Sequence, residues 1–381
     1  MHVDSRTTEP WRIGVLFSRT GVTAIIEESQ LKGTLLAVDE INQAGGVNGR
    51  ELVPIVYDPH SDDQQFARLS EKLLTEEGVT MIFGCYRSSS RKAVLPVVER
   101  RNGLLWYPTL YEGFEYSPNI IYTGAAPNQN SVELARFLME TYGTRVYFIG
   151  SDYVYPRETN RIMRQLVEQN GGKVVGETYV DLLAPPHHFK PVIRDVKRQQ
   201  PDVIFSTVVG DGTAHLYQSF YEAGLNSKTT PIASLTTSEA EVRAMGFDVA
   251  EGHITAAAYF ETVENPRNRE FVALFKKRFG IDEPTNMCVE AAYFQVHVFA
   301  KALSEINEMD TDLLRPMVLG CEFEAPQGAI AINEEYNHTN LYTRLGRANR
   351  AGKFDIVLES KSAVFADPYL VNYGCGCRTL M

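Results

Sequence analysis

The stretch IGVLF at Ile13–Phe17, followed by the segment Glu28–Ala44, sets the pattern that decides the fold. The first segment is a short, nearly continuous apolar run, which is typical of a buried strand. The second carries Leu31, Leu35 and Val38 at steps of three and four residues, which is the spacing of an amphipathic helix. A strand followed by a helix predicts the first unit of an α/β sheet.

The same alternation continues outward from this unit. Further strands are predicted at Glu51–Tyr57, Thr80–Phe83 and Leu104–Tyr107, with helices at Asp62–Glu77 and Arg91–Glu99 between them. Because a helix separates each strand from the next, the pattern predicts a parallel sheet with helices on both faces. Sheets of this kind bind ligands in the crevice at the carboxyl ends of their strands.

A second series of the same kind begins near residue 125. Its predicted strands are Val146–Ile149, Lys173–Val180, Val203–Phe205 and Pro231–Ala233, and its predicted helices are Glu158–Gln169, His188–Gln199, Gly212–Ala223 and Ser238–Met245. Beyond about Gly252 the pattern predicts one strand, the helices Arg267–Phe279 and Met287–Ile306, and short strands around Ala329–Ile332, Thr339–Arg347 and Phe354–Glu359. This remainder is enough to complete two lobes but not to build a third.

Length and charge narrow the class of protein. A chain of 381 residues exceeds the roughly 250–300 residues at which a single core stops growing. Lys and Arg number 37 against 48 Asp and Glu, a net charge of −11, which repels phosphate and argues against binding to nucleic acid or to an anionic membrane. The polar start Met1–Arg12 lacks the apolar run of a secretion signal, so we expect a cytoplasmic protein.

No motif in the sequence predicts catalysis, a cofactor or a metal site. A phosphate-binding loop, a dinucleotide fingerprint and a nucleophile elbow are all absent. The pairs His187-His188 and Cys375-Gly-Cys377 have no second pair at metal-ligand spacing. We therefore expect a binding protein rather than an enzyme.

Hydroxyl-bearing residues and tyrosines follow the predicted strands in both series. The segments are Phe17–Gly21, Gly84–Ser90, Tyr107–Gly113, Gly150–Pro156, Ser206–Gly210 and Ser234–Glu239. Helix capping accounts for Ser and Asp at such places, but it does not account for the tyrosines. Hydroxyls and aromatic rings without conspicuous charge favour a neutral polar ligand with a small apolar part. An amide fits this description, because its carbonyl accepts and its NH₂ group donates hydrogen bonds.

Several of these segments resemble the aliphatic amidase expression-regulating proteins, a family of amide sensors from bacterial amidase operons. The segments that carry the resemblance are Gly84–Tyr86, Ser90–Glu99, Tyr107–Thr109, Tyr111–Asn119, Ala126–Ser131, Gly150–Glu158, Phe205–Gly210 and Ala233–Val242. The likeness runs from about Ile13 to about Pro368, and its motifs are long and irregular.

The resemblance implies a type I periplasmic-binding-protein fold, in which two α/β lobes of mainly parallel sheet hold a ligand in the cleft between them. Together with the element order, it places residues 10–124 and 256–338 in an N-terminal lobe and residues 125–255 and 339–370 in a C-terminal lobe. Residues 371–381 are left as an irregular tail.

The resemblance also implies the ligand and the partner. It places ligand contacts at Ser88, Thr109, Tyr107 and Tyr153, with walls from Tyr86, Tyr155 and Pro108 or Leu110. Proteins of this family bind a small aliphatic amide and silence an RNA-binding antitermination protein, which they release when an inducing amide binds. The same reading allows for a homo-oligomer.

A sister family, the substrate-binding proteins of urea and short-chain-amide ABC transporters, supplies the alternative. It shares the stretch Tyr153–Arg157 and the segment Ser90–Lys92, but it usually has an apolar residue where Thr109 stands. Leu110 stands where the regulators usually have proline, which bears on the size of the pocket. The main interpretation is a cytoplasmic amide sensor, and the alternative is a transport receptor for urea or amides.

Overall fold

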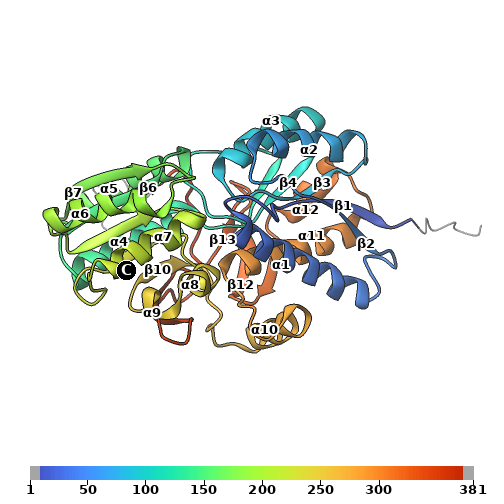
Figure 1. Cartoon of the computed structure of the whole chain (residues 1–381). Coiled ribbons are helices and arrows are strands. Elements are labelled where there is room, and N and C mark those ends of the chain that lie inside the picture. Colours follow the sequence, from blue (N-terminus) through green and yellow to red (C-terminus); the bar gives the residue numbers. More distant parts are fainter. Residues whose placement is uncertain (1–8, 372–381) are drawn as a thin grey trace, which may run out of the picture.

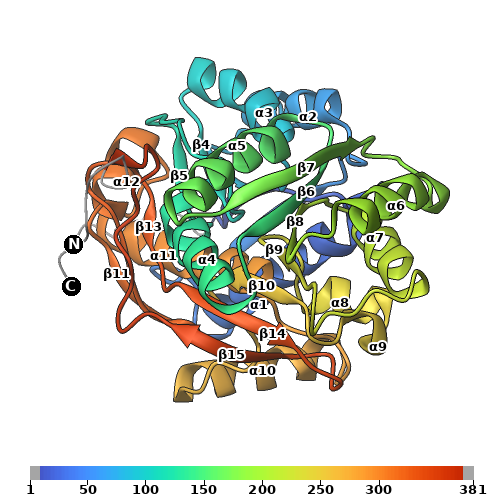
Figure 2. The same ribbon diagram turned by 90° about the vertical axis from the view of Figure 1, so that its left-hand side faces the viewer.

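A computed structural model describes residues 9–371, which form two α/β lobes side by side (Figure 1). Each lobe has its own parallel-stranded sheet with helices packed against it. The view in Figure 2 looks onto the second lobe, where helices lie on both sides of the sheet. The prediction of a two-lobed type I periplasmic-binding-protein fold is confirmed.

The first lobe is built on a five-stranded parallel sheet in the order β2-β1-β3-β4-β5. Its strands are β1 (Trp11–Leu16), β2 (Leu52–Tyr57), β3 (Met81–Gly84), β4 (Leu104–Tyr107) and β5 (Ile120–Tyr122). Its helices are α1 (Ala24–Gln43), α2 (Asp63–Thr75), α3 (Ser88–Arg101), α10 (Pro266–Phe279), α11 (Met287–Ile306) and α12 (Thr311–Val318). A small antiparallel sheet of β11 (Glu322–Ala325), β12 (Gly328–Ile332) and β13 (Thr339–Asn340) adds to it.

The second lobe is built on a seven-stranded sheet in the order β15-β14-β10-β9-β8-β6-β7. Its strands are β6 (Arg145–Ser151), β7 (Lys173–Val180), β8 (Val203–Thr207), β9 (Ile232–Ser234), β10 (Ile254–Ala257), β14 (Arg344–Ala348) and β15 (Phe354–Glu359). Its helices are α4 (Pro127–Thr141), α5 (Val154–Gln169), the short 3₁₀ turn η1 (Pro186–His188), α6 (Phe189–Gln199), α7 (Asp211–Glu222), α8 (Glu239–Met245) and α9 (Phe247–Ala250). The last two strands, β14 and β15, run antiparallel to their neighbours.

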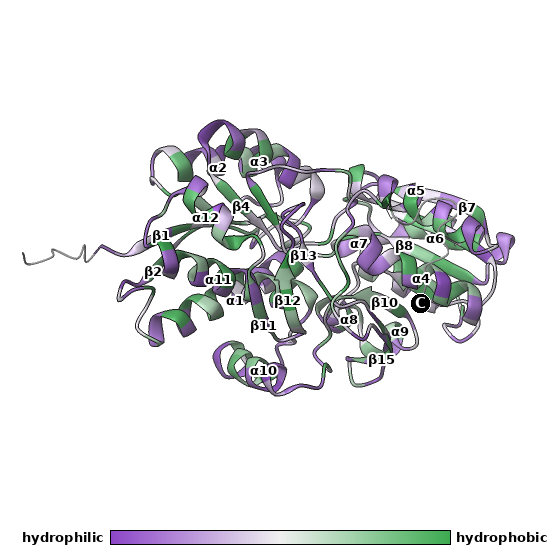
Figure 3. Cartoon of the chain, turned by 180° about the vertical axis from the view of Figure 1, so that it is seen from behind, coloured by the Kyte–Doolittle hydropathy of each residue, from purple (hydrophilic) through white to green (hydrophobic). Residues whose placement is uncertain are grey.

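The interior of both lobes is apolar, as expected for sheets that are covered on both faces. Every residue of β3, β4 and β5 is buried. Figure 3 shows hydrophobic residues gathered on the strands and on the inward sides of the helices. One apolar cluster contains Trp106 of the first lobe and Phe148 of the second, so the core continues from one lobe into the other.

Some elements lie where the sequence did not place them. Helix α3 begins at Ser88, three residues before the predicted start, which puts Ser88 in its first turn. Helix α4 was not predicted, because its first turn is polar, although Asn128 and Gln129 are buried there. Strand β10 pairs with β9 and β14, so the second sheet extends beyond residue 255, the predicted border of the lobes.

Among residues 9–371, none of the helices combines the length and the apolar character that a membrane span requires. The predicted tail at residues 371–381 lies outside the described part of the chain except for Val371, and Cys375 and Cys377 therefore lie outside it too.

Candidate functional site

The predicted site lies where the N-terminal ends of α3 and α5, one from each lobe, meet across the cleft. After β3 the chain turns at Cys85, whose left-handed φ of 70° directs Tyr86 and Ser88 toward the second lobe. After β6 the chain passes through Tyr153 and enters α5, which brings Tyr155 to the facing side. Helices α3 and α5 contact each other. Both tyrosine segments follow the carboxyl end of a strand, where open α/β sheets bind their ligands.

A small cavity lies between these helix ends. Its walls are Tyr86, Ser88, Thr109 and Leu110 from the first lobe and Tyr153, Tyr155, Val209 and Thr236 from the second. The structure therefore brings together all of the predicted site residues except Tyr107 and Pro108. We call this space the cleft cavity.

The two lobes touch each other around the cleft cavity. Tyr86 of the first lobe packs with Ala240 of the second in one apolar cluster. The guanidinium of Arg161 lies 5.4 Å from the centre of the Phe114 ring, which belongs to the other lobe. Gly210 approaches the backbone of Val22 so closely that an added Cβ would lie 2.4 Å from the Val22 carbonyl oxygen. The structure is therefore that of the closed form.

Ser88 belongs to a buried ion-pair network on the first lobe. Its hydroxyl donates to Glu112 and accepts from Nη1 of Arg91 at 3.2 Å. Arg91 is fully buried and pairs with Glu112 at 3.1 Å and with Glu115 at 2.6 Å. Burial alone would raise the pKa of Glu115, but Arg91 and the nearby Lys92 lower it to about 2.

Thr109 is the second hydroxyl of the first-lobe wall. Its Oγ1 accepts from Nε2 of Gln30 at 2.8 Å and donates to the carbonyl oxygen of Cys85 at 3.3 Å. The same Gln30 nitrogen also donates to the carbonyl oxygen of Pro108 at 3.2 Å, which fixes the orientation of the Gln30 amide. Thr109 is therefore held in place from two sides.

The second-lobe wall contains a hydroxyl that is not satisfied. Tyr155 is 3% exposed, and its hydroxyl makes no hydrogen bond of normal geometry to a described residue, although the Thr159 hydroxyl lies near enough to lower its pKa. Burial raises the pKa of this phenol well above its usual range, so it stays protonated and can donate. Its ring lies beside that of Tyr153, with 6.2 Å between the ring centroids. A buried donor without a partner at a cavity wall is suited to a ligand acceptor.

Two wall residues were missed as site residues. Val209 and Thr236 line the cleft cavity, and Thr236 donates to the carbonyl oxygen of Val208 at 3.2 Å. Both lie in the segments after β8 and β9 that the sequence marked as rich in hydroxyls. Their positions at strand ends were the available signal, but nothing in the sequence singled them out within those segments.

Tyr107 and Pro108 lie next to the cleft cavity and not on its wall. Tyr107 is fully buried, and its hydroxyl donates to the carbonyl oxygen of Tyr86 at 2.7 Å. The face of its ring lies toward Arg91, whose guanidinium carbon is 4.9 Å from the ring centroid. That Tyr107 contacts the ligand stays a prediction, and its hydroxyl supports the wall that Tyr86 forms.

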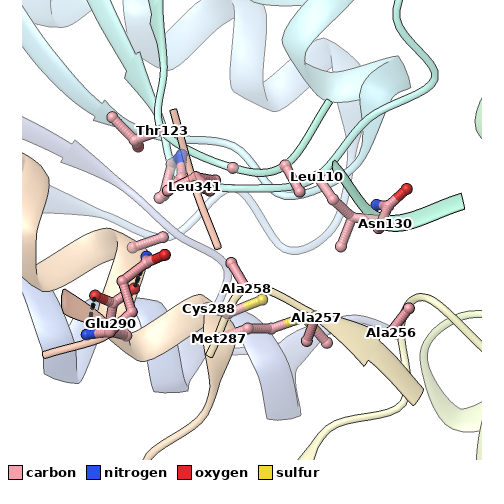
Figure 4. Close-up of a pocket in the computed structure, with 15 residues that line it drawn as sticks. Leu110, Thr123, Asn130, Ala256, Ala257, Ala258, Met287, Cys288, Glu290 and Leu341 are labelled. Atoms are coloured by element: carbon pink, nitrogen blue, oxygen red, sulfur yellow. Dashed lines mark hydrogen bonds between the residues drawn. The ribbon is translucent and has the colours of Figure 1, made fainter. Parts of the chain in front are cut away.

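Pro108 lines a second cavity, beside residues 123–125, 256–258 and Leu341, where the chain passes between the lobes. Figure 4 shows Leu110 and Asn130 on one side of this cavity and Met287 with Cys288 on the other. Because Leu110 lines both cavities, it separates them. We call this second space the hinge cavity.

Glu290 lies at the hinge cavity and is almost fully buried. Its carboxyl group accepts from Nε2 of Gln327 at 2.9 Å. Burial raises the pKa of Glu290 from 4.5 to about 8, although Gln327 and Arg344 act in the opposite direction. Below about pH 8 this side chain is therefore neutral in the folded protein.

We expect Glu290 to make the folded state less stable as the pH rises. Between pH 4.5 and 8 the unfolded chain has lost this proton and the folded chain has kept it, so the free energy of unfolding falls. In Glu290→Gln this dependence disappears. Relative to wild type, the variant should gain on the order of 3 kcal/mol of unfolding free energy between pH 5 and pH 8.

Urea denaturation at several pH values measures this difference. Glu305→Gln, at an exposed position on the same helix α11, is the control and should run parallel to wild type. If the free energy of unfolding of Glu290→Gln also changes with pH in parallel to that of wild type, the buried carboxyl does not titrate in this range.

Comparisons with known proteins agree with this geometry. Residues 11–374 match the periplasmic binding protein domain family, so the chain belongs to that family. One relative is a leucine-, isoleucine-, valine-, threonine- and alanine-binding protein of Pseudomonas aeruginosa. It is 26% identical over 321 residues, which cover 83% of this chain and 84% of the relative.

Two solved structures show the same fold. One is a solute-binding protein of an ABC transporter from Rhodopseudomonas palustris in complex with p-hydroxybenzoic acid. Its TM-score is 0.86 at 23% identity, with 96% of this chain and 100% of that chain covered. The other is a branched-chain amino acid transporter substrate-binding protein from Streptococcus pneumoniae in complex with isoleucine. Its TM-score is 0.81 at 17% identity, with 92% and 99% covered.

Proposed function

We propose that this protein binds a small aliphatic amide or urea in the cleft cavity and closes its two lobes around it. The observation that carries the proposal is the chemistry of the cavity wall. Hydroxyls and tyrosine rings meet there from both lobes, and none of the described residues that line the cavity carries a charge. The ligand that fits is therefore small, neutral and polar.

The relatives bind ligands of another kind, which the cleft cavity does not suit. An α-amino acid would bring an ammonium and a carboxylate to a wall without charged side chains, and burying unpaired charge is costly. A benzoate would bring a carboxylate to the same uncharged wall, together with a six-membered ring. An amide avoids both problems, because its polar group is neutral and its hydrogen bonds can be met by hydroxyls.

The comparisons favour the role of a transport receptor for such a ligand. Both solved structures described above are solute-binding proteins of transporters, and the chain matches them over nearly its full length. In this role the closed protein would deliver the amide or urea to a membrane permease.

The second candidate role is a cytoplasmic amide sensor that controls an RNA-binding antitermination partner. The observation that favours it is Thr109, because transport receptors for urea and amides usually carry an apolar residue there. In this structure Thr109 lines the cleft cavity. The chain as a whole is acidic, with a net charge of −11, which is also compatible with binding a basic RNA-binding protein.

Neighbouring genes and cell fractionation separate the two roles. Permease and ATPase genes beside this gene, with the protein outside the cytoplasm, would support transport. An amidase gene and an RNA-binding regulator, with the protein in the cytoplasm, would support sensing. In that case acetamide should weaken the complex between the two purified proteins.

Calorimetric titration with acetamide, lactamide, urea and leucine tests the proposed ligand class. We expect binding of at least one amide or of urea and no binding of leucine. If neither amide nor urea binds at millimolar concentration, the proposed function is wrong.

Replacing Thr109 by Val tests one wall residue. We expect Thr109→Val to weaken amide binding by about 1–2 kcal/mol, because a buried hydrogen-bonding group on the cavity wall is lost. Calorimetry of the variant measures the change. Thr34→Val is the control, since the Thr34 hydroxyl is buried on α1 without a partner among the described residues. Unchanged affinity in Thr109→Val would remove this hydroxyl from the ligand site.

A further inference from the structure

We propose that Glu112, held by Arg91, sets the hydrogen-bond polarity of Ser88, so that the Ser88 hydroxyl accepts a hydrogen bond from the ligand and does not donate one. Glu112 is then a positioning residue, because it acts on the ligand through Ser88. This inference rests on the proposed function and deepens it. It selects a ligand with an NH₂ group over one of the same shape with a carboxylate.

The polarity of Ser88 follows from its two partners. A carboxylate can only accept hydrogen bonds, so the Ser88 proton must point to Glu112. A guanidinium can only donate, so Arg91 occupies one of the two lone pairs of the Ser88 oxygen, at 3.2 Å. One lone pair is left for the cleft cavity, which Ser88 lines. Toward a ligand, Ser88 is therefore an acceptor.

The positions of Arg91 and Glu112 prevent the Ser88 hydroxyl from reversing its direction. Arg91 is fully buried, Glu112 is 3% exposed, and their side chains form an ion pair at 3.1 Å. Arg91 also donates to Glu115 at 2.6 Å, which prevents it from turning away. Reversing the Ser88 hydroxyl would leave a buried carboxylate oxygen without its donor, which is unfavourable.

Thr109 has the same polarity by a different route. Its oxygen accepts from Gln30 at 2.8 Å, and its proton faces the Cys85 carbonyl oxygen, which can only accept. The Ser88 and Thr109 hydroxyls of the first lobe are thus two acceptors, while the Tyr155 hydroxyl of the second-lobe wall is a donor. A primary amide matches this arrangement, with both N–H groups toward the first lobe and the carbonyl oxygen toward the second.

Glu112→Gln is the variant that reverses the polarity. Nη2 of Arg91 must donate to the glutamine carbonyl oxygen, so the glutamine NH₂ group turns to Ser88 and donates to it. The Ser88 proton is then free to point into the cleft cavity. The variant keeps the shape of the side chain, and Arg91 keeps Glu115 as a charged partner.

The experiment compares acetamide with acetate, which has the same shape but no donor, by calorimetric titration at pH 7. In wild type we expect acetamide to bind more tightly than acetate. In Glu112→Gln the ratio of the two affinities should fall by about tenfold or more, because one ligand hydrogen bond is lost and another is gained. Glu115→Gln is the matched control. This substitution also removes one negative charge that pairs with Arg91, but Glu115 does not contact Ser88. The ratio of acetamide to acetate affinity should therefore stay near that of wild type.

Two results would overturn the inference: an unchanged ratio in Glu112→Gln, or an equal fall in Glu115→Gln. Either result is distinct from failure of the proposed function, in which wild type itself does not bind acetamide. If Glu112→Gln does not fold, Glu112→Asp takes its place. It keeps the charge that Arg91 needs but withdraws the carboxylate from Ser88 by one methylene, so the same fall in the ratio is expected, and a wild-type ratio would contradict the inference.

Discussion

In Gly210→Ala we expect amide affinity to fall by about 10- to 100-fold, because the lobes can no longer reach the closed form. Gly210 lies before α7 with a φ of 64°, and an added Cβ would lie 2.4 Å from the Val22 carbonyl oxygen of the opposite lobe. Both atoms belong to backbone or are fixed to it, so no side-chain rotation relieves the contact. Calorimetric titration with the ligand that wild type binds measures the loss.

Gly224→Ala is the matched control for this prediction. Gly224 has a similar φ of 70°, but an added Cβ there would meet nothing within 4 Å. Both variants place an alanine at a positive φ, but the ψ of −148° at Gly210 belongs to a region that is nearly restricted to glycine, so Gly210→Ala carries that added backbone strain as well as the contact between lobes. If Gly210→Ala binds as tightly as wild type, the closed form is not the one that holds the ligand.

Removing Arg91 should have the largest effect on stability. We expect Arg91→Ala to lower the free energy of unfolding by about 3–5 kcal/mol, because it removes the buried cation of Glu112 and Glu115 and leaves them only the exposed Lys92. The loss should shrink as the pH falls toward about 4, since Glu115 of the variant no longer has Arg91 to keep its pKa at about 2 and can take up a proton. Chemical denaturation at several pH values measures both effects.

Arg100→Ala provides the comparison on the same helix α3. Arg100 is 60% exposed and pairs with Glu71 at 3.2 Å, so its loss should cost less than about 1 kcal/mol. Equal effects of the two substitutions would show that the buried network contributes no more than a surface ion pair.

The fold was predictable because its strands and helices have clear periods. The strand Lys173–Val180 and the helix Met287–Ile306 lie where the spacing of apolar residues placed them. Helix α4 was not predictable in this way, because Gln129 in its first turn is buried by hydrogen bonds to the carbonyl oxygens of Thr339 and Val364. Such tertiary hydrogen bonds leave no trace in the local pattern.

The site was predictable only as a set of loops. Their place at the ends of strands follows from the topology, and the structure gathers Tyr86, Ser88 and Tyr155 at one cavity. The role of each side chain depends on its partners, which lie far away in the sequence. Tyr107 looks like Tyr86 in the sequence, yet its hydroxyl holds a backbone carbonyl and does not reach the cavity. No pattern of residue types distinguishes the two.

The division of the wall between the lobes has a kinetic consequence. The acceptors Ser88 and Thr109 stand on one lobe and the donor Tyr155 on the other. In the open protein each half of the wall is covered by water, which donates and accepts hydrogen bonds equally well. An amide and a carboxylate should therefore bind the first lobe alone with similar affinity. The difference between them arises only when the second lobe arrives. Selectivity should then reside in how long a ligand stays and not in how fast it enters.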